Sequence, residues 1–110
     1  MAESVISEFL NRMVKAFVPE KAAGVEAVIQ LKFSGAETSN WYFTIADGKC
    51  SCVEGLAPAA KLTVSVDSGD FIKIFTGQMD GMQAFMQGKL RLTGDMNLAM
   101  KLLNLFKLQA

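Results

Sequence analysis

The first part of the chain repeats its apolar residues every three or four positions. These residues are Val5, Ile6, Phe9, Leu10, Met13, Val14 and Phe17. The spacing predicts an amphipathic helix that packs against a sheet. Ser4 can cap the start of this helix, and Pro19 prevents its continuation past Val18. One further helical turn is expected over residues 19–23, closed by Gly24.

From Val25 onward the apolar residues alternate with polar ones, which indicates half-buried strands. The alternation predicts four strands, at residues 25–33, 41–45, 49–54 and 62–66. Asp47-Gly48 is a strong signal for a two-residue hairpin between the second and third strands. Short connections among these strands favour antiparallel pairing.

Two short helices are expected after the fourth strand. Asp67 and Ser68 are both suitable caps for the first, which Gly77 ends. Asp80 can cap the second, with Gly88 as its stop.

A fifth strand and a last helix complete the expected elements. The strand covers residues 89–93 and is expected to cross over before it rejoins the sheet. Gly94 breaks the strand, and Asp95 caps a helix expected to run to about residue 106 or 108. The alternation leaves one sheet face apolar, so the helices should cover that face only. The expected fold class is α+β: a two-layer sandwich of a five-stranded, mostly antiparallel sheet and helices, in a single domain spanning residues 1–110.

Composition narrows the function classes. Eleven basic side chains balance eleven acidic ones, so no net field attracts nucleic acid. The chain has no apolar run of eighteen residues, no signal-peptide core and no targeting address at its C-terminus. Cys50 and Cys52, without a secretory signal, fit a reducing cytosol. We therefore expect a cytoplasmic protein whose contact with membranes is at most transient.

The residue types that support catalysis are scarce. The chain contains no histidine, the commonest general base and metal ligand. Cys50 and Cys52 form a C-x-C pair without the further ligands of a zinc site, and core packing is their expected role. Neither Gly48-Lys49 nor Gly88-Lys89 stands in a phosphate-binding loop. We expect neither catalysis nor a metal or cofactor.

The last helix is more apolar than a position on a sheet requires. Its polar residues, Asn97, Lys101 and Asn104, form one narrow stripe that leaves an apolar arc of roughly 220°. A helix lying on a sheet needs an arc of only about 100°. The excess must contact other helices, a second subunit or an apolar ligand. Five of the seven methionines, which fill irregular cores and also line adaptable cavities, lie in residues 77–106.

One segment of the chain resembles a known family. Residues 85–102 read FMQGKLRLTGDMNLAMKL. They resemble the AF-x-x-GKLK-x-x-GD-x-x-x-A-x-KL segment of the sterol carrier protein type two (sterol-binding) domain family. Residues 19–28, Asp47-Gly48-Lys49 and Asp70-Phe71 also fit that family, in the same order. The resemblance covers essentially the whole chain.

This resemblance implies an apolar tunnel between sheet and helices that binds sterols, fatty acids or fatty acyl-CoAs. Carried onto this sequence, the lining comprises Leu31, Phe33, Trp41, Phe43, Met82, Phe85, Met86, Met96, Met100 and Leu103. Met82 and Met100 stand where some relatives have glutamines, which favours a more purely hydrocarbon ligand.

Two alternatives remain open. The excess apolar arc could form a homodimer or partner interface in an interaction domain without a lipid. The chain could also be an accessory domain that presents acyl substrates to a separate enzyme.

Overall fold

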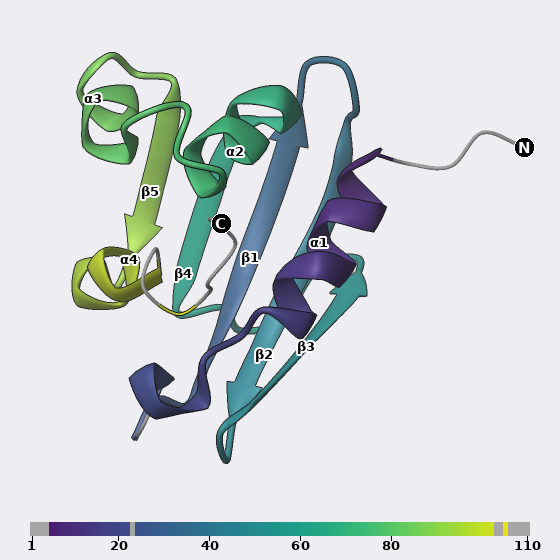
Figure 1. Cartoon of the computed structure of the whole chain (residues 1–110), viewed down its shortest axis with the longest axis vertical. Coiled ribbons are helices and arrows are strands. Elements are labelled where there is room, and N and C mark those ends of the chain that lie inside the picture. Colours follow the sequence, from purple (N-terminus) through teal and green to yellow (C-terminus); the bar gives the residue numbers. More distant parts are fainter. Residues whose placement is uncertain (1–4, 23, 103–104, 106–110) are drawn as a thin grey trace, which may run out of the picture.

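The computed structural model describes residues 5–22, 24–102 and 105, which form one sheet with helices packed across it (Figure 1). The sheet contains β1 (Ala27–Ser34), β2 (Ser39–Ala46), β3 (Lys49–Glu54), β4 (Leu62–Asp67) and β5 (Leu90–Gly94). The helices are α1 (Val5–Lys15), the 3₁₀ turn η1 (Pro19–Ala22), α2 (Ser68–Phe75), α3 (Gly81–Met86) and α4 (Met96–Leu102). The expected α+β class is confirmed.

The strands lie in the order β3-β2-β1-β4-β5. Only the β1–β4 pair is parallel, so the expectation of a mostly antiparallel sheet is confirmed. The expected position of the crossover is wrong. It lies between β3 and β4, because β4 pairs parallel with β1 on the side opposite β2, whereas β5 lies antiparallel beside β4.

A buried glutamine holds the loop that makes this crossover. Gln30 lies on the polar face of β1, yet only 4% of it is exposed. Its Nε2 donates to the Trp41 carbonyl at 2.9 Å and to the Gly55 carbonyl at 3.1 Å, and its Oε1 accepts from the Ala57 amide at 2.6 Å. The amide of Lys61 donates to the Val28 carbonyl at 2.9 Å. These bonds fix the crossover across the end of β1.

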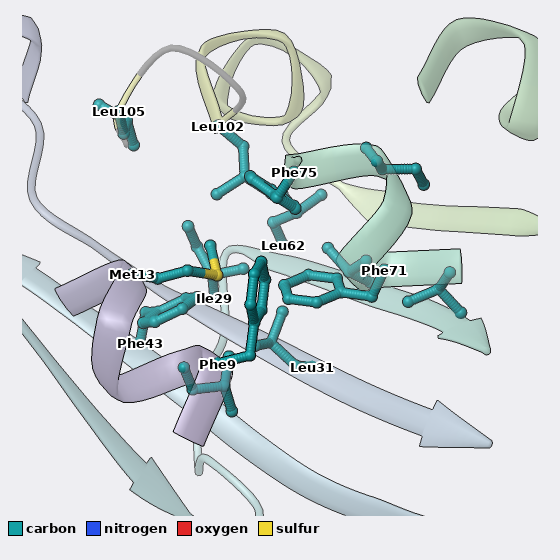
Figure 2. Close-up of a cluster of buried hydrophobic side chains, with 14 of the residues drawn as sticks. Phe9, Met13, Ile29, Leu31, Phe43, Leu62, Phe71, Phe75, Leu102 and Leu105 are labelled. Atoms are coloured by element: carbon teal, nitrogen blue, oxygen red, sulfur yellow. The ribbon is translucent and has the colours of Figure 1, made fainter. Parts of the chain in front are cut away.

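The core lies between the apolar face of the sheet and helices α1 and α2 (Figure 2). Strand register places Ile29 between Phe43 of β2 and Leu62 of β4, and all three are fully buried. Phe71 of α2 makes edge-to-face contacts, with ring centroids 4.9 Å from Phe33 and 6.0 Å from Phe9 of α1.

The last helix is shorter than expected. Helix α4 ends at Leu102, and Leu105 lies in a bend, so the expected continuous helix to residue 106 or 108 is wrong at Leu105. The Leu105 carbonyl accepts from the Val18 amide at 2.8 Å, and its side chain is fully buried. Leu105 thus joins the end of the described chain both to Leu102, whose carbonyl accepts from the Leu105 amide at 3.2 Å, and to the distant Val18.

Candidate functional site

A cavity of about 340 Å³ lies between strands β4 and β5 and helices α2, α3 and α4. This volume falls within the range of roughly 300–1,000 Å³ that is usual for small-molecule sites. Among the residues that the structure describes, Asp80 is the only charged one that lines it. The cavity is therefore suited to an apolar ligand.

The floor of the cavity comes from the apolar face of the sheet edge. Val64 of β4 and Leu90 and Leu92 of β5 line it. The register pairs Val64 with Leu92 and Val66 with Leu90, so the alternating side chains of both strands reach the same face. β5 is an edge strand, and the floor ends with it.

Helix α2 forms one wall. Phe71, Ile74 and Phe75 follow the i, i+3, i+4 spacing that places side chains on one side of a helix, and all three line the cavity. The start of α2 is fixed by Asp67, whose Oδ1 accepts from the Gly69 amide at 2.8 Å and the Asp70 amide at 3.2 Å.

Helices α3 and α4 form the mouth. Met82 and Phe85 of α3 are 60% and 40% exposed, and Met96 and Met100 of α4 are 44% and 69% exposed, although all four line the cavity. Flexible thioether side chains can repack around ligands of different shape. Asp80 lies beside them as the cap of α3, its Oδ1 accepting from the Met82 amide at 2.8 Å and the Gln83 amide at 3.2 Å.

A Gly-Asp pair sets the position of α4 over the cavity. Gly94 has a φ of +118°, and a Cβ added there would collide with the Lys61 carbonyl. Asp95 donates its amide to that carbonyl at 2.8 Å, while its Oδ1 accepts from the amides of Asn97 and Leu98 at 2.9 and 3.1 Å. Only glycine permits this close approach of β5 to β4, and the aspartate then begins the helix.

The structure brings four of the ten residues expected from the sequence to this cavity: Met82, Phe85, Met96 and Met100. Met86 is 78% exposed and does not line it. Leu103 lies outside the described residues.

The four expected residues on β1 and β2 lie elsewhere. Leu31, Phe33 and Phe43 are buried in the core, and Trp41 is half-buried with its Nε1 donating to the Ser39 hydroxyl at 3.0 Å. Phe71 contacts Phe33 from the core side and also lines the cavity, so it stands between the two compartments. None of the β1 and β2 side chains lines the cavity.

The sequence analysis did not include the residues of the α2 wall and the β5 floor among the expected lining residues. The signals were present, as the helical spacing of Phe71, Ile74 and Phe75 and the alternation of Leu90 and Leu92. Those signals identify a buried face, but they do not indicate which part of it borders a cavity.

Cys50 and Cys52 lie on β3, the edge of the sheet opposite β5. Both are half-buried free thiols. Burial raises the pKa of Cys52 to about 12, and burial together with the neighbouring Cys52 raises the pKa of Cys50 to about 12. These thiols stay protonated near neutral pH, and nothing links them to the cavity.

Within the described ranges, no three potential metal-ligating side chains come together. Within the same part of the chain, every helix is too short or too polar to cross a bilayer.

Comparison with known proteins relates this geometry to a family. Hydroxysteroid dehydrogenase-like protein 2 of Xenopus tropicalis is 43% identical over 94 residues, covering 83% of this chain and 22% of that protein. Human sterol carrier protein 2 is 36% identical over 86 residues, covering 78% of this chain and 16% of that protein. The chain thus spans about a fifth of the length of these curated relatives.

A solved structure shares the fold over nearly its full length. The solution structure of palmitated SCP2L2 from Aedes aegypti matches with a TM-score of 0.71 and 28% identity, covering 94% of this chain and 93% of that one. The sequence model of the SCP-2 sterol transfer family matches residues 6–107, which include the sheet and the described helices. The resemblance seen in residues 85–102 is thereby confirmed, and the chain belongs to the SCP-2 sterol transfer family.

Proposed function

We propose that this chain binds the acyl chain of a lipid in the cavity between β4, β5, α2, α3 and α4. The observation that carries the proposal is the chemistry of the lining. Apart from Gly81 and Asp80 it consists of apolar side chains, and the Asp80 carboxylate already accepts two helix amides. An ionised headgroup gains no cationic partner from this lining, whereas a hydrocarbon chain gains apolar contacts with the floor, the α2 wall and the mouth.

Burial of hydrocarbon supplies the binding free energy. Each methylene moved from water into an apolar site contributes about 0.8 kcal/mol, before the cost of ordering the ligand. Met82, Met96 and Met100 can repack around chains of different length or branching. We therefore expect loose specificity within apolar ligands.

We favour a fatty acid or fatty acyl-CoA as the ligand class, with sterols as a competing class. The palmitated state of SCP2L2, which shares the fold at 28% identity, supports a fatty acyl ligand. The names of the family and of human sterol carrier protein 2 support sterols. A displacement series with palmitate, palmitoyl-CoA and cholesterol ranks the three.

The binding is proposed to be non-catalytic and to serve lipid transfer between membranes. A second candidate role is presentation of an acyl substrate to an enzyme. It is favoured by the match to only 22% of a dehydrogenase-like protein, because the rest of that protein is available for other activities. A cytoplasmic location stays a prediction.

Displacement of a fluorescent fatty acid by palmitate tests the proposal. Ala99 is a small, half-buried lining residue, and Ala99→Trp would fill part of the cavity. Because the indole removes room for several methylenes, we expect palmitate affinity to fall at least about tenfold.

The matched control is Ala59→Trp, at an exposed loop position away from the cavity, which should leave affinity unchanged. Circular dichroism of both variants checks that they fold. Undiminished binding by folded Ala99→Trp protein, or failure of the wild type to bind any of the three ligands, would contradict the proposal.

A further inference from the structure

The lining of the cavity is graded from exposed to buried across the sheet. At the mouth, the lining side chains of α3 and α4 are exposed, whereas Val64 of β4 and Phe71 of α2 are buried. Val64 pairs with Leu92 of β5 on one side and with Leu31 of β1 on the other. Leu31 is fully buried and does not line the cavity. The cavity therefore runs inward from the edge strand β5 and ends between β4 and β1.

The ring of Phe71 closes this inner end. It lines the cavity, and on the core side it makes edge-to-face contacts with Phe33 of β1 and Phe9 of α1. Figure 2 shows the ring of Phe71 directed at the ring of Phe9. Phe75, one turn further along α2, also lines the cavity, and its ring centroid lies 4.7 Å from that of Phe71. These contacts hold the Phe71 ring in place as a wall.

The space beyond Phe71 is apolar and filled. Phe9, Leu31 and Phe33 belong to the same buried cluster as Val64 of the cavity floor. A close-packed core has no room for a further hydrocarbon chain, so a chain that enters the cavity stops at Phe71. Without the Phe71 ring, the cavity lining would continue over the apolar side chains of the core.

A fatty acid in this cavity would direct its methyl end at Phe71. A carboxylate loses its hydration when it is buried without a partner, so it stays at the mouth. Asp80, the one charged side chain lining the described part of the cavity, is itself an anion. The methionines of α3 and α4 lie at the mouth, so they can adapt to the shape of a chain without setting how deeply it enters.

We propose that Phe71 sets the upper limit on the length of acyl chain that the cavity buries. Methylenes up to this limit lose their contact with water, and those beyond it stay at the mouth. Affinity therefore rises with chain length and then reaches a plateau. This inference rests on the proposed function, because it names the residue that makes the cavity select among acyl chains.

Displacement of a fluorescent fatty acid by the saturated series from octanoate to arachidate tests the limit. In the wild type, affinity should rise about fourfold per methylene up to the plateau. Phe71→Ala should move the plateau to chains about four carbons longer, because a benzene-sized space in an apolar core stays dry and accepts hydrocarbon. Octanoate does not reach Phe71, so its affinity should stay unchanged.

Phe71→Leu is the milder variant, which retains more of the packing against Phe33 and Phe9. It should move the plateau by about two carbons, because a smaller part of the ring's space becomes free. Circular dichroism checks that both variants fold.

The matched control is Phe9→Leu, which removes a ring that contacts Phe71 from the core side but does not line the cavity. The Phe71 ring still closes the cavity in this variant, so the free energy of unfolding should fall while the plateau stays in place. Combined Phe9→Leu and Phe71→Leu should move the plateau further than Phe71→Leu alone, because the two freed spaces then join. A purely structural role of Phe71 would lower stability in both single variants and move the plateau in neither.

An unchanged plateau in folded Phe71→Leu, or an equal shift in Phe9→Leu, would overturn the role of Phe71. A wild-type affinity that still rises at arachidate would overturn it as well, because the cavity would then have no such limit. If the wild type binds no fatty acid of the series, the proposed function fails together with this inference. Wild-type binding with a plateau that Phe71→Leu does not move refutes the length limit alone.

Discussion

Gly94 determines how closely β5 approaches β4 at the point where the chain turns into α4. Its φ of +118° is accessible to glycine and strained for other residues, and the Lys61 carbonyl occupies the space of a Cβ. The adjacent Asp95 uses the same carbonyl as its acceptor. A methyl group at residue 94 would therefore move both the edge strand and the start of α4.

Gly94→Ala should lower the free energy of unfolding by about 2–3 kcal/mol, through backbone strain and the collision with Lys61. Urea denaturation measures the change. Gly88→Ala is the matched control, because Gly88 also has a positive φ, of +77°, but no atom lies within 4 Å of an added Cβ. Gly88→Ala should lower the free energy of unfolding by only about 1 kcal/mol. Equal losses would show that the close approach to Lys61 has no energetic role.

The sequence predicts some single residues at the site and misassigns others. Met82, Met96 and Met100, which the family resemblance implies as lining residues, do line the cavity. Leu31 and Phe33 are correctly placed on the apolar face of β1 by alternation. Alternation reports the face of a strand, however, and not whether a helix such as α2 fills the space above it.

The N-terminal ends of helices α2, α3 and α4 lie where the sequence predicts them, because they depend on local hydrogen bonds. Asp67, Asp80 and Asp95 begin α2, α3 and α4 as expected, because an N-cap acts on amides two and three residues ahead. The end of α4 and the position of the crossover were predicted wrongly. The crossover follows from the pairing of β1 with β4, and Leu105 beyond α4 accepts a hydrogen bond from Val18, so both features involve distant segments.

The hydrogen bonds of Gln30 to the crossover loop should contribute to the free energy of unfolding. Gln30→Leu keeps a side chain of similar size but leaves the Ala57 amide and the Gly55 carbonyl without their partner. We expect a loss of about 2–4 kcal/mol in the free energy of unfolding, since each buried polar group left unpaired costs about 1–3 kcal/mol.

The control for Gln30→Leu is Thr44→Leu, on the same outer face of the neighbouring strand β2, with an expected change within about 1 kcal/mol. Hydrogen exchange at the Ala57 amide provides an independent readout, because exchange should accelerate only in Gln30→Leu. A protected Ala57 amide in that variant would show that the loop does not depend on Gln30.

At the scale of the whole molecule, one region of the sheet is covered by a packed core and the other borders the cavity. Around β1 and β2 the side chains close into a core with α1 and Phe71 (Figure 2). Around β4 and β5 the space under α3 and α4 is open. The tunnel expected from the resemblance extended over the whole apolar face, whereas the observed cavity occupies the β5 end alone.

The raised pKa values of Cys50 and Cys52 predict how the free energy of unfolding depends on pH. Because the pKa of Cys50 and Cys52 is about 12 in the folded protein, against an ordinary value of 9.0, the unfolded chain loses these protons first as pH rises. The unfolded state therefore binds fewer protons between about pH 9 and pH 12, and the free energy of unfolding falls across that window. Below pH 9 the thiols are protonated in both states and add no pH dependence.

Urea titrations at a series of alkaline pH values measure this slope. Combined Cys50→Ala and Cys52→Ala should flatten it relative to the wild type, while the tyrosine and lysine residues, present in both proteins, contribute equally. An identical slope in the two proteins would show that burial of the thiols has no thermodynamic effect.

The position of Phe71 bears on how proteins of this design can change over evolution. Phe71 packs against Phe33 of the core on one side and lines the cavity on the other. Met96 and Met100 line the cavity, whereas Ile29 and Phe43 are buried in the core, so the effects of substitutions at the two places on stability should be nearly additive. Under the proposed function, the preference for one lipid over another can then change by substitutions at the mouth, while the selection that maintains the fold acts on a separate set of residues.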